Sequence, residues 1–404
     1  MAEKQNTPEI RFEGFTDPWE QRKLNEYLET SREKNESCRF DKDDVLSVSG
    51  DYGIVNQIEF QGRSYAGASV ANYGVVHKGD VVYTKSPLRS NPYGIIKTNR
   101  GNDGIVSTLY AVYHPAERTH PDFVEVYFEQ NARMNNYMAP LVSKGAKNDM
   151  KVSAENALKG AVIFPEIEEQ EVIASYFSQL DHLITLHQRK YDKLCTVKKS
   201  MLDKMFPKPG ETEPEIRFEG FTDPWEQRKL GGLFFESNER SSSMEILSVS
   251  VAKGIYPASE SNRDTNPGAS LANYKVVHKG DVVYNSMRMW QGAVGSSDYD
   301  GIVSPAYVVA RPVIELDSTC FGYLLKRPEM LYKYLCDSQG NSKDTQTLKY
   351  NRFADIEVTM PVNLEEQRVI SACLGRVDTL ITLHQRKLEL LRNIKKSLLD
   401  RMFV

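Results

Sequence analysis

The longest regular pattern of apolar residues lies between Pro165 and Pro207, in a stretch that contains no Gly or Pro. Apolar side chains recur there at alternating steps of four and three residues, with His187 and Lys198 at two of the expected apolar positions. This spacing is typical of a coiled-coil seam and predicts a long helix over residues 165–206. The apolar positions of this seam are Ile173, Phe177, Leu180, Ile184, Tyr191, Leu194, Met201 and Met205.

The same pattern returns in the last forty or so residues, with His384 and Lys395 at the two interruptions. Its apolar positions are Ile370, Leu374, Val377, Ile381, Leu388, Leu391, Leu398 and Met402. A single helix of this kind would leave its apolar stripe in water, so each helix needs a partner. We predict that the two helices form an antiparallel coiled coil within the chain. The two histidines interrupt its seam, and the two lysines extend from its edge.

The residues before each helix follow a different pattern. Short runs rich in Val, Ile, Tyr and Phe, such as GDVVY (79–83) and GIVSTLYAVY (104–113), alternate with breaks rich in Gly, Asn, Pro and Ser. Such runs are typical of strands bounded by turns. The pattern therefore predicts an α+β protein in which globular pieces of mixed strand and helix alternate with long helices.

An internal repeat runs along the whole chain. The segment PEIRFEGFTDPWEQRKL occurs unchanged at 8–24 and at 214–230, and VVHKGDVVY occurs at 75–83 and at 276–284. Further along, ITLHQRK occurs at 184–190 and at 381–387. The period is too long for a solenoid, so the chain consists of two copies of one domain-plus-helix unit, with approximate two-fold symmetry.

The repeat divides the chain into five segments. The two globular domains, each with its shared N-terminal segment, cover residues 1–164 and 214–361. The helices cover 165–206 and 362–404, and a linker at 207–213 contains Pro and Gly. If each helix runs from its own domain towards the other, the helices hold two surfaces at a set spacing.

Composition limits the classes of function. The chain has 404 residues, a formal net charge of −4 and five cysteines without CxxC spacing. These cysteines favour neither a zinc site nor a disulfide framework, so we expect a cytoplasmic protein with no bound metal. No apolar run approaches the roughly 20 residues of a membrane-spanning helix, so we expect no membrane association. Any surface that binds nucleic acid must be basic only locally.

The order of domain, helix, domain, helix resembles the specificity (S) subunits of type I restriction–modification systems. The start of each helix is also similar to that family, in which a Pro, a short spacer, a Glu-Gln pair and an Ile follow one another. Here this pattern is PEIEEQEVI (165–173) and PVNLEEQRVI (361–370). Each follows a polar loop that contains Gly, at 143–152 and 338–348. The WEQRKL and GDVVY segments are similar to those of the family as well.

This resemblance implies a function. Each globular piece would be a target-recognition domain that recognises one half of a split, asymmetric site on double-stranded DNA, with the helices as a spacer. The shared segments would dock two methyltransferase (M) subunits, and restriction (R) subunits would join that core. The chain itself would be non-catalytic and bind no cofactor, while S-adenosylmethionine would bind to the M subunits.

Basic and amide side chains follow the same strand in both halves, at 84–100 and at 285–292. Lys and Arg bind phosphates, whereas Arg, Lys, Asn and Gln read base edges. The predicted DNA-binding residues are Lys85, Arg89, Asn91, Lys97 and Arg100 in the first half, Arg288, Trp290 and Gln291 in the second half, and Lys147, Asn148, Lys343, Gln346 and Lys349 in or beside the polar loops. Ordinary solvated loops, with Trp290 packed in a core, would explain the same residues.

Two other classes of function remain open. A DNA methyltransferase or nuclease would need its own catalytic motif, and NPYG (91–94) lacks the second proline of the Asn-Pro-Pro-Tyr signature. No GxGxxG or P-loop motif follows a strand. A coiled-coil adaptor that binds only proteins is favoured by the acidic net charge, but it does not explain the basic residues that follow the same strand twice.

Overall fold

A computed structural model describes residues 6–85, 91–144, 150–261, 270–340 and 345–404. The chain divides into unit 1, residues 1–188 and 386–404, and unit 2, residues 189–385. Both boundaries run through the long helices α5 (Ile167–Lys204) and α9 (Leu364–Arg401). Each unit therefore contains one globular domain and one segment of each long helix.

In unit 1, the core sheet has the antiparallel order β2-β9-β6-β7. Strand β6, one of the two inner strands, is buried on both faces. Val81 and Tyr83 belong to the main core, while Val82 belongs to a second apolar cluster with Val112. The strands are β1 (Glu20–Lys23), β2 (Leu28–Thr30), β3 (Leu46–Ser49), β4 (Gly53–Asn56), β5 (Gly74–Val76), β6 (Val81–Thr84), β7 (Ile96–Thr98), β8 (Gly104–Val106), β9 (Tyr110–Pro115), β10 (Ser143–Lys144), β11 (Met150–Lys151) and β12 (Ala161–Phe164). The short helices are α1 (Gln57–Gln61), α2 (Pro121–Glu129), α3 (Asn131–Met138) and α4 (Ala154–Ala157).

Unit 2 repeats this topology. Its core sheet has the order β14-β21-β18-β19, and Val282 and Tyr284 of the central strand join the main core while Val283 faces a second cluster. The strands are β13 (Glu226–Lys229), β14 (Phe234–Glu236), β15 (Leu247–Ser250), β16 (Gly254–Pro257), β17 (Lys275–Val277), β18 (Val282–Asn285), β19 (Val294–Ser296), β20 (Gly301–Val303), β21 (Tyr307–Pro312) and β22 (Glu357–Met360). The short helices are α6 (Ser318–Leu324), α7 (Pro328–Asp337) and α8 (Tyr350–Asp355). The predicted α+β class and its duplicated architecture are confirmed.

The repeated segment at 8–24 holds the start of α5. Its strand β1 pairs with β12, the strand that leads into the helix. Arg11 donates from Nε and Nη2 to the two carboxylate oxygens of Glu169, each at 2.7 Å, and the indole N–H of the buried Trp19 donates to Glu169 Oε2 at 3.2 Å. This arrangement is here called the arginine–tryptophan clamp.

The clamp recurs in unit 2. Arg217 donates to both carboxylate oxygens of Glu366, at 2.7 and 2.9 Å, and the indole N–H of Trp225 donates to Glu366 Oε1 at 3.2 Å. Glu169 and Glu366 are the buried glutamates of the Glu-Gln pairs that begin the two helices. The repeated segment is therefore conserved within the chain because it fixes the same helix start twice.

Helices α5 and α9 each contain 38 residues. Every predicted seam position from Ile173 to Leu194 and from Ile370 to Leu391, including the two histidines, is buried or half-buried. Intervening residues such as Leu183 and Leu186 are exposed. The apolar stripe thus has the predicted phase on both helices.

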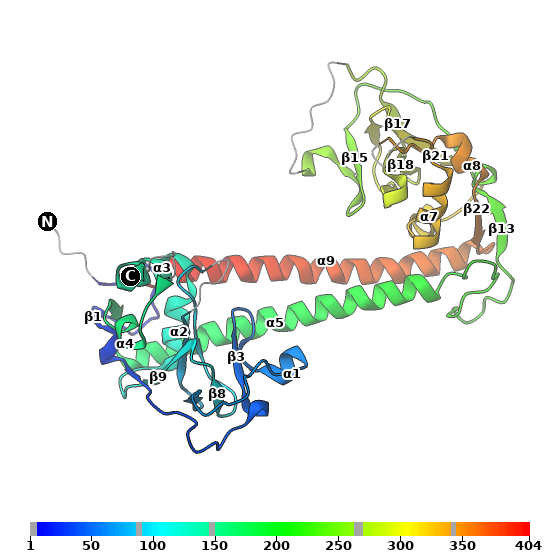
Figure 1. Ribbon diagram of the computed structural model, residues 1–404. Coiled ribbons are helices and arrows are strands. Elements are labelled where there is room, and N and C mark those ends of the chain that lie inside the picture. The colour runs from blue at the N-terminus through cyan, green and yellow to red at the C-terminus, as the bar shows by residue number, and fades with distance from the viewer. Residues whose placement is uncertain (1–5, 86–90, 145–149, 262–269, 341–344) are drawn as a thin grey trace. The chain divides into compact units, whose positions relative to one another are not determined.

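Within unit 1, the start of α5 and the end of α9 lie side by side and run antiparallel (green and red in Figure 1). Lys395 Nζ lies 2.6 Å from Asp181 Oδ1, and Arg392 donates to Gln188 Oε1 at 3.1 Å, so residue numbers rise along one helix as they fall along the other. Phe403, just beyond α9, is buried in the main core of unit 1.

Within unit 2, the end of α5 meets the start of α9 in the equivalent way. Lys198 Nζ lies 2.6 Å from Asp378 Oδ1, and Phe206 is buried in the same core as Ile370 and Leu374. We predicted that Lys198 and Lys395 extend from the seam edge. Instead, both lysines bind an aspartate on the neighbouring helix, and the two pairs occupy matching positions of the repeat.

Candidate nucleic-acid interface

The stretch after β18 forms a tight turn that exposes two predicted DNA-binding residues. The backbone N–H of Arg288 donates to the carbonyl oxygen of Asn285 at 3.0 Å, and a single turn of 3₁₀ helix follows. That turn ends at Gly292, whose φ of 95° lies in the left-handed region that favours glycine. Met289 is fully buried and anchors the turn, so Arg288 and Gln291 lie on the surface.

Trp290 is less exposed than Arg288 and Gln291. Its ring is half-buried and packs against the main core of unit 2. Its buried indole N–H has no hydrogen-bond partner among the described residues. Trp290 therefore anchors the turn from its inner side, as the structural alternative proposed, while Arg288 and Gln291 remain the exposed candidates.

A second predicted stretch of unit 2 meets this turn. The backbone N–H of Leu348 donates to the carbonyl oxygen of Ser286 at 2.8 Å, which places Gln346 and Lys349 beside the residues after β18. Lys349 is exposed, and neither it nor Arg288 has an ion-pair partner in the described part of the chain. Gln346 is half-buried, and its side-chain N–H donates to the carbonyl oxygen of Gly340 at 3.4 Å.

In unit 1, Lys85 occupies the position that Ser286 occupies in unit 2. Its backbone N–H donates to the carbonyl oxygen of Leu109 at 3.1 Å, just as that of Ser286 donates to Ala306 at 3.4 Å. Burial, and then the charge of Lys34, lower the pKa of the Lys85 ammonium group. Sequence reasoning missed Lys34, because it lies far from Lys85 along the chain.

Asn91 begins a turn that ends at Gly94, a position where a residue other than glycine would clash. Its carbonyl oxygen accepts a hydrogen bond from the N–H of Gly94 at 3.0 Å, and Gly94 has a φ of 81°. A Cβ at Gly94 would lie 2.0 Å from the carbonyl oxygen of Thr84, so no other residue fits. Four further predicted residues lie outside the described residues: Arg89, Lys147, Asn148 and Lys343.

Lys97 and Arg100 have partners that the sequence did not suggest. Lys97 Nζ lies 3.0 Å from Glu125 on α2, with its side chain only 14% exposed. Arg100 pairs with Asp122 and Glu125 of the same helix, each at 3.0 Å. Because these carboxylates neutralise both cations and hold them against α2, we count neither residue among the candidate phosphate ligands.

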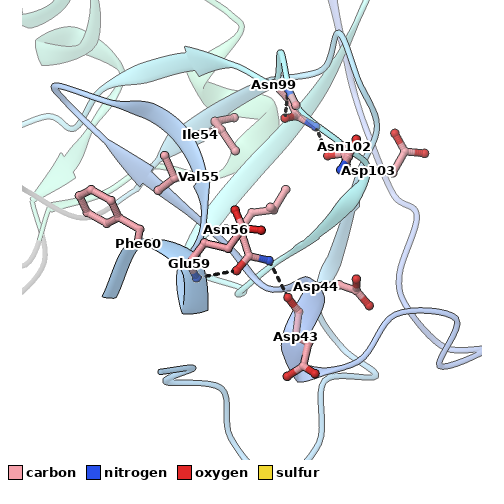
Figure 2. A pocket seen from close by; sticks show the side chains of 12 residues that line it. Asp43, Asp44, Ile54, Val55, Asn56, Glu59, Phe60, Asn99, Asn102 and Asp103 are labelled. Carbon is pink, nitrogen blue, oxygen red and sulfur yellow. Dashed lines mark hydrogen bonds between the residues drawn. The ribbon is translucent and has the colours of Figure 1, made fainter. Parts of the chain in front are cut away.

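An acidic hollow of about 640 Å³ lies elsewhere on unit 1. Figure 2 shows Asp43, Asp44 and Asp103 around it, together with Asn56, which accepts a hydrogen bond from the N–H of Glu59 and donates to the carbonyl oxygen of Asp43. Like charges repel a phosphate backbone, so this face is unsuitable for DNA. No group of three or more potential metal ligands was found among the described residues.

Comparison with known proteins agrees with this geometry. Residues 222–393 match the family model described as "Type I restriction modification DNA specificity domain". The chain carries a domain of this family. The first half repeats its shared segments and its strand pairings, so the predicted relationship to specificity subunits is confirmed.

One solved structure resembles this chain along nearly its whole length. The S subunit of a type I restriction–modification system from M. genitalium has a TM-score of 0.61 and 12% identity, covering 98% of this chain and 99% of that one. At this identity the likeness shows the fold. The HsdS subunit from Thermoanaerobacter tengcongensis is 16% identical over 95% of this chain and 96% of that one, with a TM-score of 0.44, too low to support a fold assignment.

The long helices α5 and α9 also expose apolar residues. In unit 1, Leu183 and Leu186 of α5 and Leu390 and Ile394 of α9 are 37–53% exposed. These positions lie around the Asp181–Lys395 and Gln188–Arg392 contacts. No described helix has a stretch long and apolar enough to cross a bilayer.

Unit 2 exposes apolar residues at three of the four equivalent positions, the exception being Lys193, which is the repeat of Leu390. The three are Val197 of α5 and Leu380 and Leu383 of α9, which are 39–59% exposed. Leu380 and Leu383 are the repeats of Leu183 and Leu186, and Ile394 is the repeat of Val197. Each unit therefore presents apolar positions from both helices, drawn from the same places in the repeat.

Proposed function

We propose that this chain is a specificity subunit that reads a bipartite, asymmetric DNA target, with one globular domain on each half-site. The observation that carries this proposal is that the two globular domains share one strand topology but differ in the residues that follow the equivalent strands β6 and β18. The same strand pairings support the residues after β6 and after β18, yet Lys85 stands where Ser286 does, and the two stretches differ throughout. A shared scaffold with different exposed polar residues is what two readers of different bases need.

We further propose that two methyltransferase subunits dock on the chain and that restriction subunits join through them. The exposed apolar residues of α5 and α9 support this, because three of the four such positions of unit 1 are also apolar and exposed in unit 2. A water-facing apolar position that is retained in both copies favours a protein contact. Two equivalent surfaces favour two copies of the same partner.

The chain would be non-catalytic and would act in the cytoplasm. It would supply recognition, while its partners supply methylation and cleavage chemistry, with S-adenosylmethionine bound to the methyltransferase subunits. The DNA-contacting residues would include Lys85 after β6, Arg288 and Gln291 after β18, and Lys349 beside the latter two.

Co-expression with a methyltransferase partner tests the proposal. DNA from such cells is sequenced by a method that detects methylated adenine. We expect one asymmetric motif with two defined halves and an undefined gap. Methylation by the chain without a partner would favour an enzyme, and a complex that forms but leaves no sequence-specific mark would favour a protein-only adaptor.

A further inference from the structure

A small basic hollow opens beside the end of β6 in unit 1. Its volume is about 250 Å³, and Arg32, Lys34 and Lys85 all line it. None of the three forms an ion pair with a residue in the described part of the chain. This distinguishes them from Lys97 and Arg100, which are both neutralised by α2.

The backbone holds Arg32 and Lys34 rigidly at this hollow. The N–H of Ser31 donates to Val112 at 2.9 Å, the carbonyl oxygen of Glu33 accepts from Val75 at 3.2 Å, and Lys34 forms a β-bridge with Gly74. Alternate residues of an extended segment share a face, so Arg32 and Lys34 lie on the same side of it. Main-chain bonds therefore hold the backbone from which both side chains extend.

The carboxylates that line the hollow do not cancel this charge. Glu33 also lines the hollow, and its carboxylate lies 2.9 Å from the ring of His77, which is not a lining residue. Glu33 and Glu155 together place two carboxylates against three cations. Burial and the neighbouring Lys34 lower the pKa of Lys85, and Glu155 raises it to a smaller extent, so an anion in the hollow would reduce the remaining repulsion between the cations.

We propose that Arg32, Lys34 and Lys85 bind a phosphodiester group of the DNA backbone in the first half-site. This inference rests on the proposed function and assigns Arg32 and Lys34 a role that the sequence did not predict. The hollow lies where β6 ends, and the candidate reading stretch begins there. The acidic hollow lies elsewhere on unit 1, lined by other residues. A phosphate contact fixes the register of the domain on the duplex and carries no base preference.

The residues at the equivalent positions of unit 2 can serve as replacements in unit 1, because both units have the same topology. The contacts of Glu33 and Glu239 with their histidines show that Arg32 corresponds to Asn238, and the backbone bonds given above show that Lys85 corresponds to Ser286. The variant Arg32→Asn/Lys85→Ser therefore carries residues that stand at the same places in the other domain. Lys42→Ser, an exposed lysine next to Asp43 of the acidic hollow, is a control for Lys85→Ser.

The test is the salt dependence of DNA binding by the complex with its partner, on a duplex that contains the mapped target. Each neutralised phosphate contributes about 0.9 to the slope of log affinity against log salt concentration, so we expect the double variant, which loses one phosphate contact, to lose up to about 0.9. We expect Lys42→Ser to leave the slope unchanged. The methylated motif should keep both halves.

Two results would overturn this inference while leaving the proposed function intact. One is a slope in the double variant equal to that of the wild type, with melting curves showing that the variant is folded. The other is a change in the bases of the first half-site, which would make these residues base readers. Absence of any bipartite motif in the wild type would instead refute the proposed function itself.

Discussion

Lys395 of α9 lies 2.6 Å from the carboxylate of Asp181 on α5, and its side chain is only 13% exposed. Glu129 of α2 binds the same ammonium group at 2.5 Å. One lysine thus joins both long helices to the globular domain of unit 1. In unit 2, Lys198 and Asp378 repeat the interhelical pair, with Lys198 also above the ring of Tyr323.

Removing this lysine should destabilise unit 1. We expect Lys395→Ala to lower the free energy of unfolding by about 1–3 kcal/mol, because two carboxylates lose a charged hydrogen-bond partner. Urea denaturation measures the change. The neighbouring Lys396 is exposed and without an ion pair to any described residue, so Lys396→Ala should have almost no effect. Equal losses from the two variants would contradict the role given to Lys395.

Substitution in the arginine–tryptophan clamp should lower the free energy of unfolding more than Lys395→Ala does. Glu169→Gln keeps the shape of the side chain and removes its charge, leaving the largely buried Arg11 without its partner. Breaking such a pair from one side costs about 3–5 kcal/mol. The adjacent Glu168 is exposed, so Glu168→Gln is the matched control. A Glu169→Gln variant as stable as that control in urea would show that the clamp does not hold the helix start.

The stability of the first globular domain should depend on pH through the protonation of His77. Hydrogen bonds to Asp103 and Glu33 raise the pKa of His77 above its ordinary value of about 6.5. The stabilisation is therefore complete below about pH 6.5 and is lost as pH rises through the folded-state pKa. The same contact lowers the pKa of Asp103, whose contribution is lost as pH falls through its own folded-state value.

Thermal melting of the wild type and of His77→Gln across this range checks the dependence. We expect the difference in Tm to be greatest in mildly acidic solution and to shrink above neutral pH. The effect should be small, because His77 is 35% exposed and the contacts are screened by solvent. A difference in Tm that stays constant across the range would contradict the assignment.

In the second domain, Arg288 is the exposed residue placed best to read a base. Arg288→Ala should weaken binding at one half-site by about 1–3 kcal/mol, the cost of a lost bidentate contact to a base. Competition binding with duplexes altered in one half at a time measures this. Arg228 is bound to Glu226 in the shared strand β13, so Arg228→Ala should leave both halves unaffected. If Arg288→Ala weakened binding equally to every duplex, Arg288 would contact a phosphate and not a base.

The repeat and the seam could be predicted from sequence because both depend on local spacing. Steps of four and three place Ile173, Phe177 and Leu180 on one helical face regardless of the rest of the fold. The helix start was likewise predictable as a motif. The bond from its glutamate to Arg11 was not, because that pair joins residues far apart in sequence.

Charged side chains were harder to place for the same reason. Lys97 looked available because no acid lies near it in sequence, yet α2 brings Glu125 to it. Arg32 and Lys34 were not predicted as DNA-binding residues, yet both line the hollow together with Lys85, and His77 binds the intervening Glu33. Long-range packing, which no local pattern encodes, decides which cations reach the surface unpaired.

The central claim is that each globular domain reads its own half-site from one of two equivalent positions. It is tested most directly by a chain in which residues 25–163 replace residues 231–359, joined at the shared Leu24/Leu230 and at the matching positions Phe164 and Met360. Mapping methylated DNA from cells that carry this chain and its partner should give an inverted repeat of the first half-site, since the helices run antiparallel within each unit. A motif that keeps its original second half would contradict the claim.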